Sequence, residues 1–275
     1  MNLSGYERIK INGLNFYMKT EGLALVESIE KILMSRKCSP IEKWRKVKNL
    51  LDSQHYSVLS DTFLLYAHHL ENKAITLTDN ERGATEQIMQ MVAEVCLEKA
   101  RDLDDNDFEV HRLLAEVKLS QENFKAAEKY ARKCFKLVPN DPRVLSVYGE
   151  VLVRIGQVDK GLEALESAYE LNPIAPGKTN EDHRLSSILF GNFMARNRKG
   201  CVAIIYKLES IDFRSWILTT KLCHDEEYNY QETKWFIFGK NNFSKIDWKE
   251  EILRFKLNNK STTEALKEFA NNILA

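Results

Sequence analysis

Residues 108–141 read FEVHRLLAEVKLSQENFKAAEKYARKCFKLVPND, and residues 142–173 read PRVLSVYGEVLVRIGQVDKGLEALESAYELNP. In each part, apolar residues recur every three or four positions in two runs, and a short polar break separates the runs. Such spacing is typical of amphipathic helices. Because Pro139 and Pro173 lie 34 positions apart (173 − 139), the stretch predicts one helix pair that is repeated once.

Start and stop signals bound these predicted helices. Asp141 precedes Pro142, so a capping carboxylate is followed by a proline at the first helical position. Gly156 follows the first apolar run of the second part, and glycine accepts the left-handed conformation that often closes a helix. Asp107 is expected to cap the helix that follows it in the same way.

Small side chains recur at equivalent positions of the two parts. The eighth, twentieth, twenty-seventh and thirty-second positions hold Ala115 and Gly149, Ala127 and Gly161, Cys134 and Ala168, and Pro139 and Pro173. This pattern resembles the tetratricopeptide repeat (TPR), which is a 34-residue helix pair. The resemblance implies an all-α fold of antiparallel helix pairs stacked as a right-handed superhelix.

Outside this stretch the repeats become degenerate, and we predict three parts of the chain. They are N-terminal helices with a degenerate repeat in 1–82, core repeats in 83–173, and degenerate repeats with a capping helix in 174–275. In the last part, Gly191 and Ala203 are expected to take the small positions of a third repeat, and a final helix is expected from Thr262 onward.

The N-terminal part is expected to consist of helices, followed by a polar loop over Asn72–Arg82. Apolar spacing predicts two helices within Tyr6–Met34, with Gly22 near their junction, and a basic amphipathic helix after Pro40. A further helix is predicted over Ser57–Glu71.

Composition excludes several classes of function. Lys+Arg and Asp+Glu are equal at 40 each, so the strong basic excess typical of nucleic-acid-binding proteins is absent, and we expect no specific nucleic-acid binding. No apolar run approaches the ~18 residues that cross a bilayer, so we expect no membrane insertion. Five dispersed cysteines without a CxxC pair favour a reducing compartment, and we predict a cytoplasmic protein.

The candidate metal-binding and catalytic motifs of the sequence lack residues or spacings that these functions require. Asp102–Asp107 suggests a calcium loop, but the positions that need Gly and Glu hold Asp107 and Leu113. Cys223–Glu226 offers metal-ligating residue types, yet consecutive residues diverge on a helix. We find no phosphate-binding Gly-rich loop, GxSxG or HExxH motif. We therefore predict no cofactor, no metal and no catalytic residue, and an enzyme is the least favoured class.

The TPR resemblance implies a non-catalytic scaffold that binds a partner peptide or helix in a concave groove lined by the first helix of each repeat. The predicted groove residues of the first repeat are Glu109, Arg112, Glu116 and Leu119, and those of the second are Arg143, Ser146, Glu150 and Val153. Those of the third repeat are Leu185, Ile188, Asn192 and Ala195. The partner's identity does not follow from the sequence, and homodimerisation stays open.

A regulatory role is the alternative. Residues 6–213, including CLEKARDLDDNDFEVHRLLAEVKL and ALESAYELNP, resemble the TPR portion of bacterial HilA/CadC-like regulators and of some adenylate cyclases. That resemblance implies a sensory array that controls a transcription factor or cyclase. The chain carries no winged helix or cyclase domain, so it would be a free-standing relative or a portion of a longer protein.

Overall fold

The structure is a computed structural model, and it describes residues 6–11, 14–19, 28–29, 31–32, 35, 40–53, 84–175, 178, 180–253, 255, 257 and 259–274. The chain forms two compact units, Met1–Val117 and Lys118–Ala275, which we describe separately. The three-part division expected from the sequence stays a prediction, and the helix predicted over Ser57–Glu71 and the polar loop after it lie outside the described residues.

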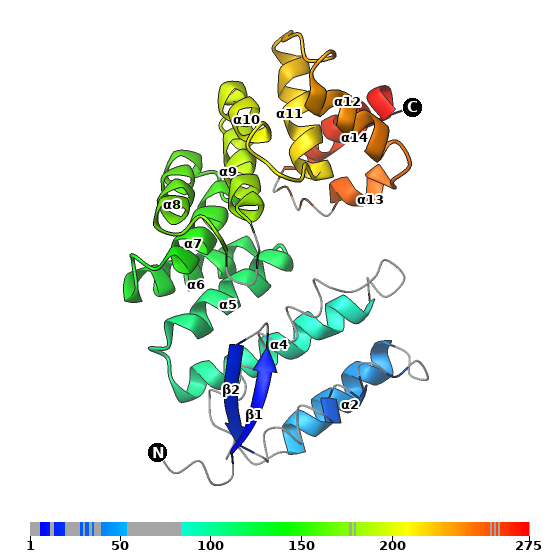
Figure 1. Cartoon of the computed structure of the whole chain (residues 1–275). Helices are drawn as coiled ribbons and strands as arrows, with labels where there is room; N and C mark the ends of the chain where they lie inside the picture. Colours follow the sequence, from blue (N-terminus) through cyan, green and yellow to red (C-terminus); the bar gives the residue numbers. More distant parts are fainter. Residues whose placement is uncertain are drawn as a thin grey trace. The chain divides into compact units, whose positions relative to one another are not determined.

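The first unit begins with a β-hairpin. Strands β1 (Tyr6–Ile11) and β2 (Leu14–Lys19) pair antiparallel, with Tyr6 opposite Lys19 and Ile11 opposite Leu14 (Figure 1). The helix predicted at the start of Tyr6–Met34 is therefore wrong. The physical reason is visible in the sequence, because Leu14–Lys19 alternates apolar and polar residues and Asn12-Gly13 is the residue pair typical of two-residue hairpin connections.

Two helices of the first unit contact each other. These are α2 (Pro40–Ser53), which confirms the helix predicted after Pro40, and α4 (Ala84–Leu103). Buried Ala93, Leu97 and Ala100 follow one another at helical spacing on α4, so one face of α4 is apolar and covered. A turn leads to α5 (Phe108–Ser120), where the Asp107 carboxylate accepts the Glu109 N–H at 2.9 Å, as the capping prediction required.

The second unit is a succession of helices, and neighbours along the chain pack together from α6 to α12. Its helices are α6 (Phe124–Leu137), α7 (Pro142–Arg154), α8 (Val158–Leu171), α9 (Asp182–Met194), α10 (Arg198–Ile205), α11 (Phe213–Asp225), α12 (Lys234–Phe243), α13 (Trp248–Leu253) and α14 (Lys260–Leu274). The first helices of successive pairs also contact each other, α7 with α9 and α9 with α11. α14 packs on α11, α12 and α13, which confirms the predicted final helix.

The same turn follows the first helix of four pairs, at the ends of α5, α7, α9 and α11. At four places a residue with positive φ follows that helix, namely Glu122 (59°), Gly156 (89°), Arg196 (54°) and Glu227 (53°). The next residue donates its N–H to a carbonyl five positions earlier, as in Asn123 to Lys118 at 2.9 Å and Tyr228 to Cys223 at 2.8 Å. This bond is the 6→1 hydrogen bond of the Schellman motif. The turns lie 34 (156 − 122), 40 (196 − 156) and 31 (227 − 196) residues apart, so the period lengthens and then shortens.

Close approach within the second pair confirms the predicted small positions. A β-carbon added to Gly149 on α7 would lie 2.8 Å from the carbonyl oxygen of Gly161 on α8. Side chains larger than hydrogen therefore do not fit between these two helices without a shift of the backbone.

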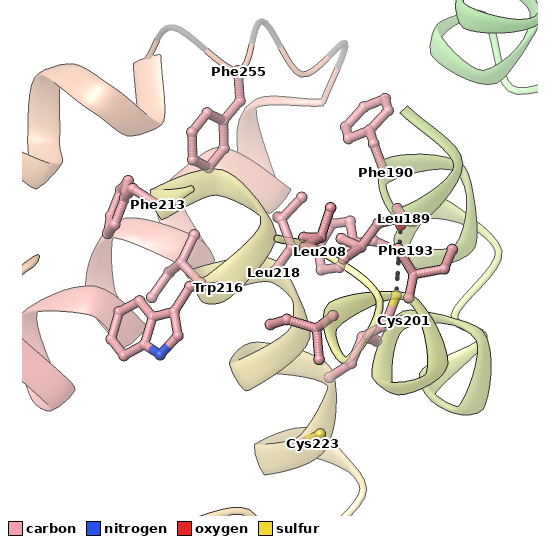
Figure 2. Close-up of a cluster of buried hydrophobic side chains, with 14 of the residues drawn as sticks. Leu189, Phe190, Phe193, Cys201, Leu208, Phe213, Trp216, Leu218, Cys223 and Phe255 are labelled. Carbon is pink, nitrogen blue, oxygen red and sulfur yellow. Dashed lines mark hydrogen bonds between the residues drawn. The ribbon is translucent and has the colours of Figure 1, made fainter. Parts of the chain in front are cut away.

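The predicted register of the third pair is wrong by two residues. The Cys201 thiol lies 3.5 Å from the Leu189 carbonyl oxygen and is buried there, whereas Ala203 is exposed (Figure 2). Counted from the turn at Arg196, Leu189 and Cys201 take the eighth and twentieth positions, not Gly191 and Ala203. Six residues beyond the 34-residue period precede this turn (40 − 34), so the period of the first two pairs does not extend into α9.

An apolar cluster of the second unit extends from Val153 on α7 to Ala270 on α14. Trp216 on α11 is fully buried and lies near Phe213 (Figure 2). It also packs on Phe236 and Phe243, with ring centroids 5.9 and 5.6 Å away. The Trp216 indole N–H donates to the Phe236 carbonyl oxygen at 3.3 Å, so its polar atom is satisfied inside the core. These aromatic residues anchor the terminal helices on α11.

Candidate partner-binding face

In the first unit, the predicted binding residues of α5 are engaged with each other. The Arg112 guanidinium donates to Glu109 at 2.8 Å and to Glu116 at 2.5 Å, and its side chain is largely buried. These are i, i+3 and i, i+4 pairs, which stabilise a helix face. Their role in partner binding stays a prediction.

Several predicted binding residues are covered by the fold. Leu119 is buried at the end of α5, and Val153, Leu185 and Ile188 are buried in the apolar cluster of the second unit. The burial of Leu185 and Ile188 follows from the packing of the whole helix, because every residue of α9 from Arg184 to Phe193 is buried.

Asn192 belongs to the same displaced set. It is buried, donates to the Ile188 carbonyl oxygen at 3.0 Å and accepts from the Asn197 amide at 2.6 Å. It therefore supports the turn between α9 and α10. In the corrected register, the equivalent positions of α9 hold His183, which is exposed, and Ser186 and Phe190, which are buried.

Three of the four predicted residues on α7 remain partly exposed. Arg143 donates to its neighbour Asp141 at 2.7 Å, Ser146 is half-exposed, and Glu150 accepts a hydrogen bond from Ser187 on α9 at 2.6 Å. Arg143, Ser146 and Glu150 follow each other at helical spacing and share one side of α7. The Glu150–Ser187 bond shows that this side meets α9.

Side chains from α7, α9 and α11 converge around Phe190. The Arg154 guanidinium on α7 lies 4.6 Å from the Phe190 ring centroid, and the Arg214 guanidinium on α11 lies 5.8 Å from it. Both distances are within the range of cation–π attraction. One aromatic ring on the middle helix thus holds an arginine from each neighbouring first helix.

Glu150 lies close to the positively charged side chains of Arg154 and Arg214. Burial by itself raises the pKa of Glu150, but Arg154, the Ser187 hydroxyl, His183 and Arg214 together hold it below its ordinary value. The carboxylate is therefore ionised at neutral pH and balances part of the arginine charge.

Arg184 on α9 lies beside this group and is only 2% exposed. It donates to the Pro142 carbonyl oxygen at 3.2 Å, whereas its Nε and Nη2 atoms have no hydrogen-bond partner among the described residues. A buried donor without a partner is costly, and a buried guanidinium more so. We call the eight residues Asp141, Arg143, Glu150, Arg154, Lys178, His183, Arg184 and Arg214 the arginine cluster.

Two cysteines of the second unit, Cys201 and Cys223, are buried. Burial raises the pKa of the Cys201 thiol to about 12 and that of Cys223 to about 11, so both are thiols at neutral pH. In the part of the chain that the structure describes, no group of three or more His, Cys, Asp or Glu side chains is placed to hold a metal ion. No described helix combines the length and apolar character needed to span a membrane.

These features define the class of protein as an all-α, TPR-like array of helix pairs, which confirms the predicted fold class. The N-terminal hairpin that precedes the array in the sequence was not predicted. A solved structure with this fold is PilF of Pseudomonas aeruginosa, with a TM-score of 0.51 at 13% identity over 82% of this chain and 93% of that chain. The likeness concerns the fold alone.

Two other solved structures are more distant in shape. MamA of Desulfovibrio magneticus RS-1 has a TM-score of 0.45 at 18% identity, over 76% of this chain and 99% of that one. Yeast Tom70 has a TM-score of 0.43 at 16% identity, over 91% of this chain and 54% of that one. No protein-family model and no curated protein matches the chain, and the HilA/CadC-like and cyclase resemblance finds no support in these comparisons.

Proposed function

We propose that this protein is a non-catalytic protein–protein interaction scaffold whose second unit binds a peptide segment of a partner on the face formed by α7, α9 and α11. The observation that carries the proposal is the convergence of polar side chains from these three helices, seen in the Glu150–Ser187 bond and in the two arginines on Phe190. Stacked first helices of TPR-like pairs form a continuous surface on which an extended or helical peptide can lie.

The corrected register shifts the proposed binding residues on α9. Arg143, Ser146 and Glu150 are retained on α7, and His183 and Arg214 join them from α9 and α11. Leu185, Ile188 and Asn192 are better explained by packing, because their side chains are buried. Binding by the predicted α5 residues Glu109, Arg112 and Glu116 of the first unit stays a separate prediction.

The proposal is tested by selecting binders from a random twelve-residue peptide library with the full chain. Affinities of the selected peptides are then measured for Ser146→Trp, which places a large side chain one turn from Glu150, and for Glu163→Trp on the exposed side of α8. We expect at least about tenfold weaker binding by the Ser146 variant alone, because bulk on the face excludes the peptide.

Equal loss in both variants, or in neither, would place binding elsewhere and overturn the proposal, as would a selection that yields no binder. Thermal melting of each variant separates loss of binding from loss of fold.

The narrower alternative, a sensory array of a transcription regulator or cyclase-type protein, gains no specific support from the arrangement of residues. Cytoplasmic location and homodimerisation likewise stay predictions.

A further inference from the structure

Helix α12 carries apolar side chains on its outer side as well as on its buried side. The buried side is fixed by Phe236 and Gly239, which lie against Trp216 on α11. On the opposite side, Ile237 is 49% exposed and Phe238 is 44% exposed. Among the exposed large apolar residues of the described part of the chain, only these two are adjacent in the sequence. Scattered apolar residues are ordinary on a protein surface, whereas grouped ones indicate a site of interaction.

The exposed side of α12 forms one continuous face. Its residues are spaced i, i+3, i+4 and i+7, and they are Lys234, Ile237, Phe238 and Asn241, all exposed. Residues at this spacing lie on the same side of a helix. The Phe238 ring lies edge-on to the ring of half-buried Phe243, with 6.3 Å between centroids, so the core supports this side of the helix. We call these four exposed residues the α12 outer face.

Charge on and beside this face is positive. From Thr233 to Ile246 every charged residue is an exposed lysine, namely Lys234, Lys240 and Lys245. The nearest acidic residues in the sequence lie at the two ends of this stretch, Glu232 before the helix and Asp247 before α13. The helices that pack on α12 do not reverse the sign, because α11 has two Lys or Arg and one Asp, and α14 has two Lys and two Glu. Helix α13, with one Lys and two Glu, packs on α11 and α14.

Lys234 is not explained by the stability of the helix. It is the first residue of α12, directly after the Thr233 cap, and the first turn holds no acidic residue. The N-terminal end of a helix carries a partial positive charge and disfavours basic side chains. Neither Lys234 nor Lys240 forms an ion pair with a described acidic side chain. Both lysines can therefore meet an external negative charge.

A bilayer that contains anionic lipids matches the apolar and the basic character of this face. Apolar side chains can enter the boundary between headgroups and acyl chains, and lysines beside them reach the headgroup phosphates. Helix α12 contains no arginine, whose rigid fork suits a fixed partner, whereas a lysine is a flexible point charge that suits mobile headgroups. The face is also small, because α12 has 10 residues, whereas a stable protein interface uses about 20–30 residues on each side.

A second copy of this chain is a poorer match. Symmetric pairing through α12 would bring Lys234 and Lys240 of one copy toward the same residues of the other. Like charges at such an interface repel each other and oppose pairing.

We propose that the α12 outer face docks the protein reversibly on an anionic membrane surface. Its apolar pair enters the interface, and Lys234 and Lys240 bind the headgroups. Such docking is peripheral and needs no membrane-spanning helix. The face shares no residue with the arginine cluster or with the face of α7, α9 and α11, so the inference does not depend on the proposed peptide binding.

The test measures co-sedimentation of the full chain with lipid vesicles. One preparation contains three parts of phosphatidylcholine to one part of phosphatidylserine, and the other contains phosphatidylcholine alone. We expect at least about tenfold tighter binding to the vesicles with phosphatidylserine, and this preference should weaken in high salt, which screens the lysines.

Two double variants separate the apolar and the charged parts of the face. Ile237→Ser with Phe238→Ser should weaken binding at least about tenfold, because the apolar contact with the bilayer is lost. Lys234→Gln with Lys240→Gln should weaken binding about tenfold, because two attractions to the anionic surface are lost. The lysine variant changes exposed positions only, so it tests the inference even if the apolar variant fails to fold.

Two further double variants are the matched controls. Leu171→Ser with Ile174→Ser changes two apolar residues that are 58% and 43% exposed, and Lys136→Gln with Lys160→Gln changes two exposed lysines. Both controls should bind the vesicles as wild type does. Thermal melting of every variant detects loss of fold.

Equal binding to both kinds of vesicle, no binding to either, or equal loss in the controls would each overturn the inference. Retained vesicle binding by both α12 variants would do so as well. Peptides from the random library that lose affinity for the Ile237 and Phe238 variant, without any vesicle binding, would overturn it and assign the face to a protein partner. Ser146→Trp should bind vesicles as wild type does, so failure of this inference and failure of the scaffold proposal are distinguishable.

Discussion

The carbonyl oxygen of Gly149 on α7 lies 2.8 Å from the place that a β-carbon on Gly161 of α8 would occupy. The backbone N of Val153 is equally near to that place. Backbone atoms cannot move aside as a flexible side chain can, so this pair of glycines sets the distance between the two helices.

Gly161→Ala should therefore destabilise the second unit by about 1–3 kcal/mol, through overpacking against α7. An uncrowded Gly-to-Ala change inside a helix stabilises by up to about 1 kcal/mol, so the sign of the effect is diagnostic. Urea unfolding of wild type and variant measures it, with Lys160→Ala at an exposed position of the same helix as control. An increase in stability of the Gly161 variant would show that the helices are not in this contact.

Substitutions at two of the left-handed turns should change the stability of the protein in opposite directions. Gly156→Ala should cost about 1 kcal/mol, because a β-carbon is disfavoured at φ 89°. Arg196→Gly, at the equivalent turn with φ 54°, should stabilise by about 0.5–1 kcal/mol after the extra entropy of the unfolded chain is counted. Melting temperatures of the two variants check both signs, and a shift in the same direction for both would contradict the shared turn.

Asp141 should make stability depend on pH. Burial by itself raises its pKa, but hydrogen bonds from the Arg143 side chain and backbone, the Arg143 charge and the Val144 N–H hold the pKa below the ordinary 3.8. Because the folded pKa is depressed, the contribution of Asp141 is fully present above about pH 4 and is lost as pH falls through the folded value.

Asp141→Asn separates capping from titration, since asparagine caps a helix about as well as aspartate. Its free energy of unfolding should change less between pH 5 and pH 3 than that of wild type, whereas Asp141→Ala should lose about 1 kcal/mol at neutral pH. Equal pH profiles for wild type and the Asn variant would assign the acid sensitivity to other carboxylates.

Ser187 and Glu150 form the hydrogen bond that joins α9 to α7 on the proposed binding face. Ser187→Ala should destabilise by about 1–3 kcal/mol at neutral pH, because the carboxylate of Glu150 loses a donor. It should also raise the pKa of Glu150, so the loss relative to wild type should shrink as pH falls and the carboxylate is protonated. Ser146→Ala, at a half-exposed position, is the control and should be within about 0.5 kcal/mol of wild type.

Short sequence motifs are sufficient to predict the helical repeat. The 34-residue spacing, the Asp141-Pro142 start signal and Gly156 predicted where helices begin and end, because caps and turns depend on a few neighbouring residues. The hairpin is also predictable from the sequence, because the Asn12-Gly13 pair and the alternating apolar and polar residues after it are local signals. Apolar residues spaced three or four apart occur over the same residues and favour a helix, so the two local patterns compete there.

What the chain alone determined, then, is the kind of repeat and the ends of its helices. The tertiary structure decided the register after the insertion before α9 and the meeting of Glu150, Arg154, Ser187 and Arg214 around Phe190. The reason is physical: caps and turns are set by contacts within a few residues, whereas this face depends on how three helices separated by loops of unequal length pack against one another.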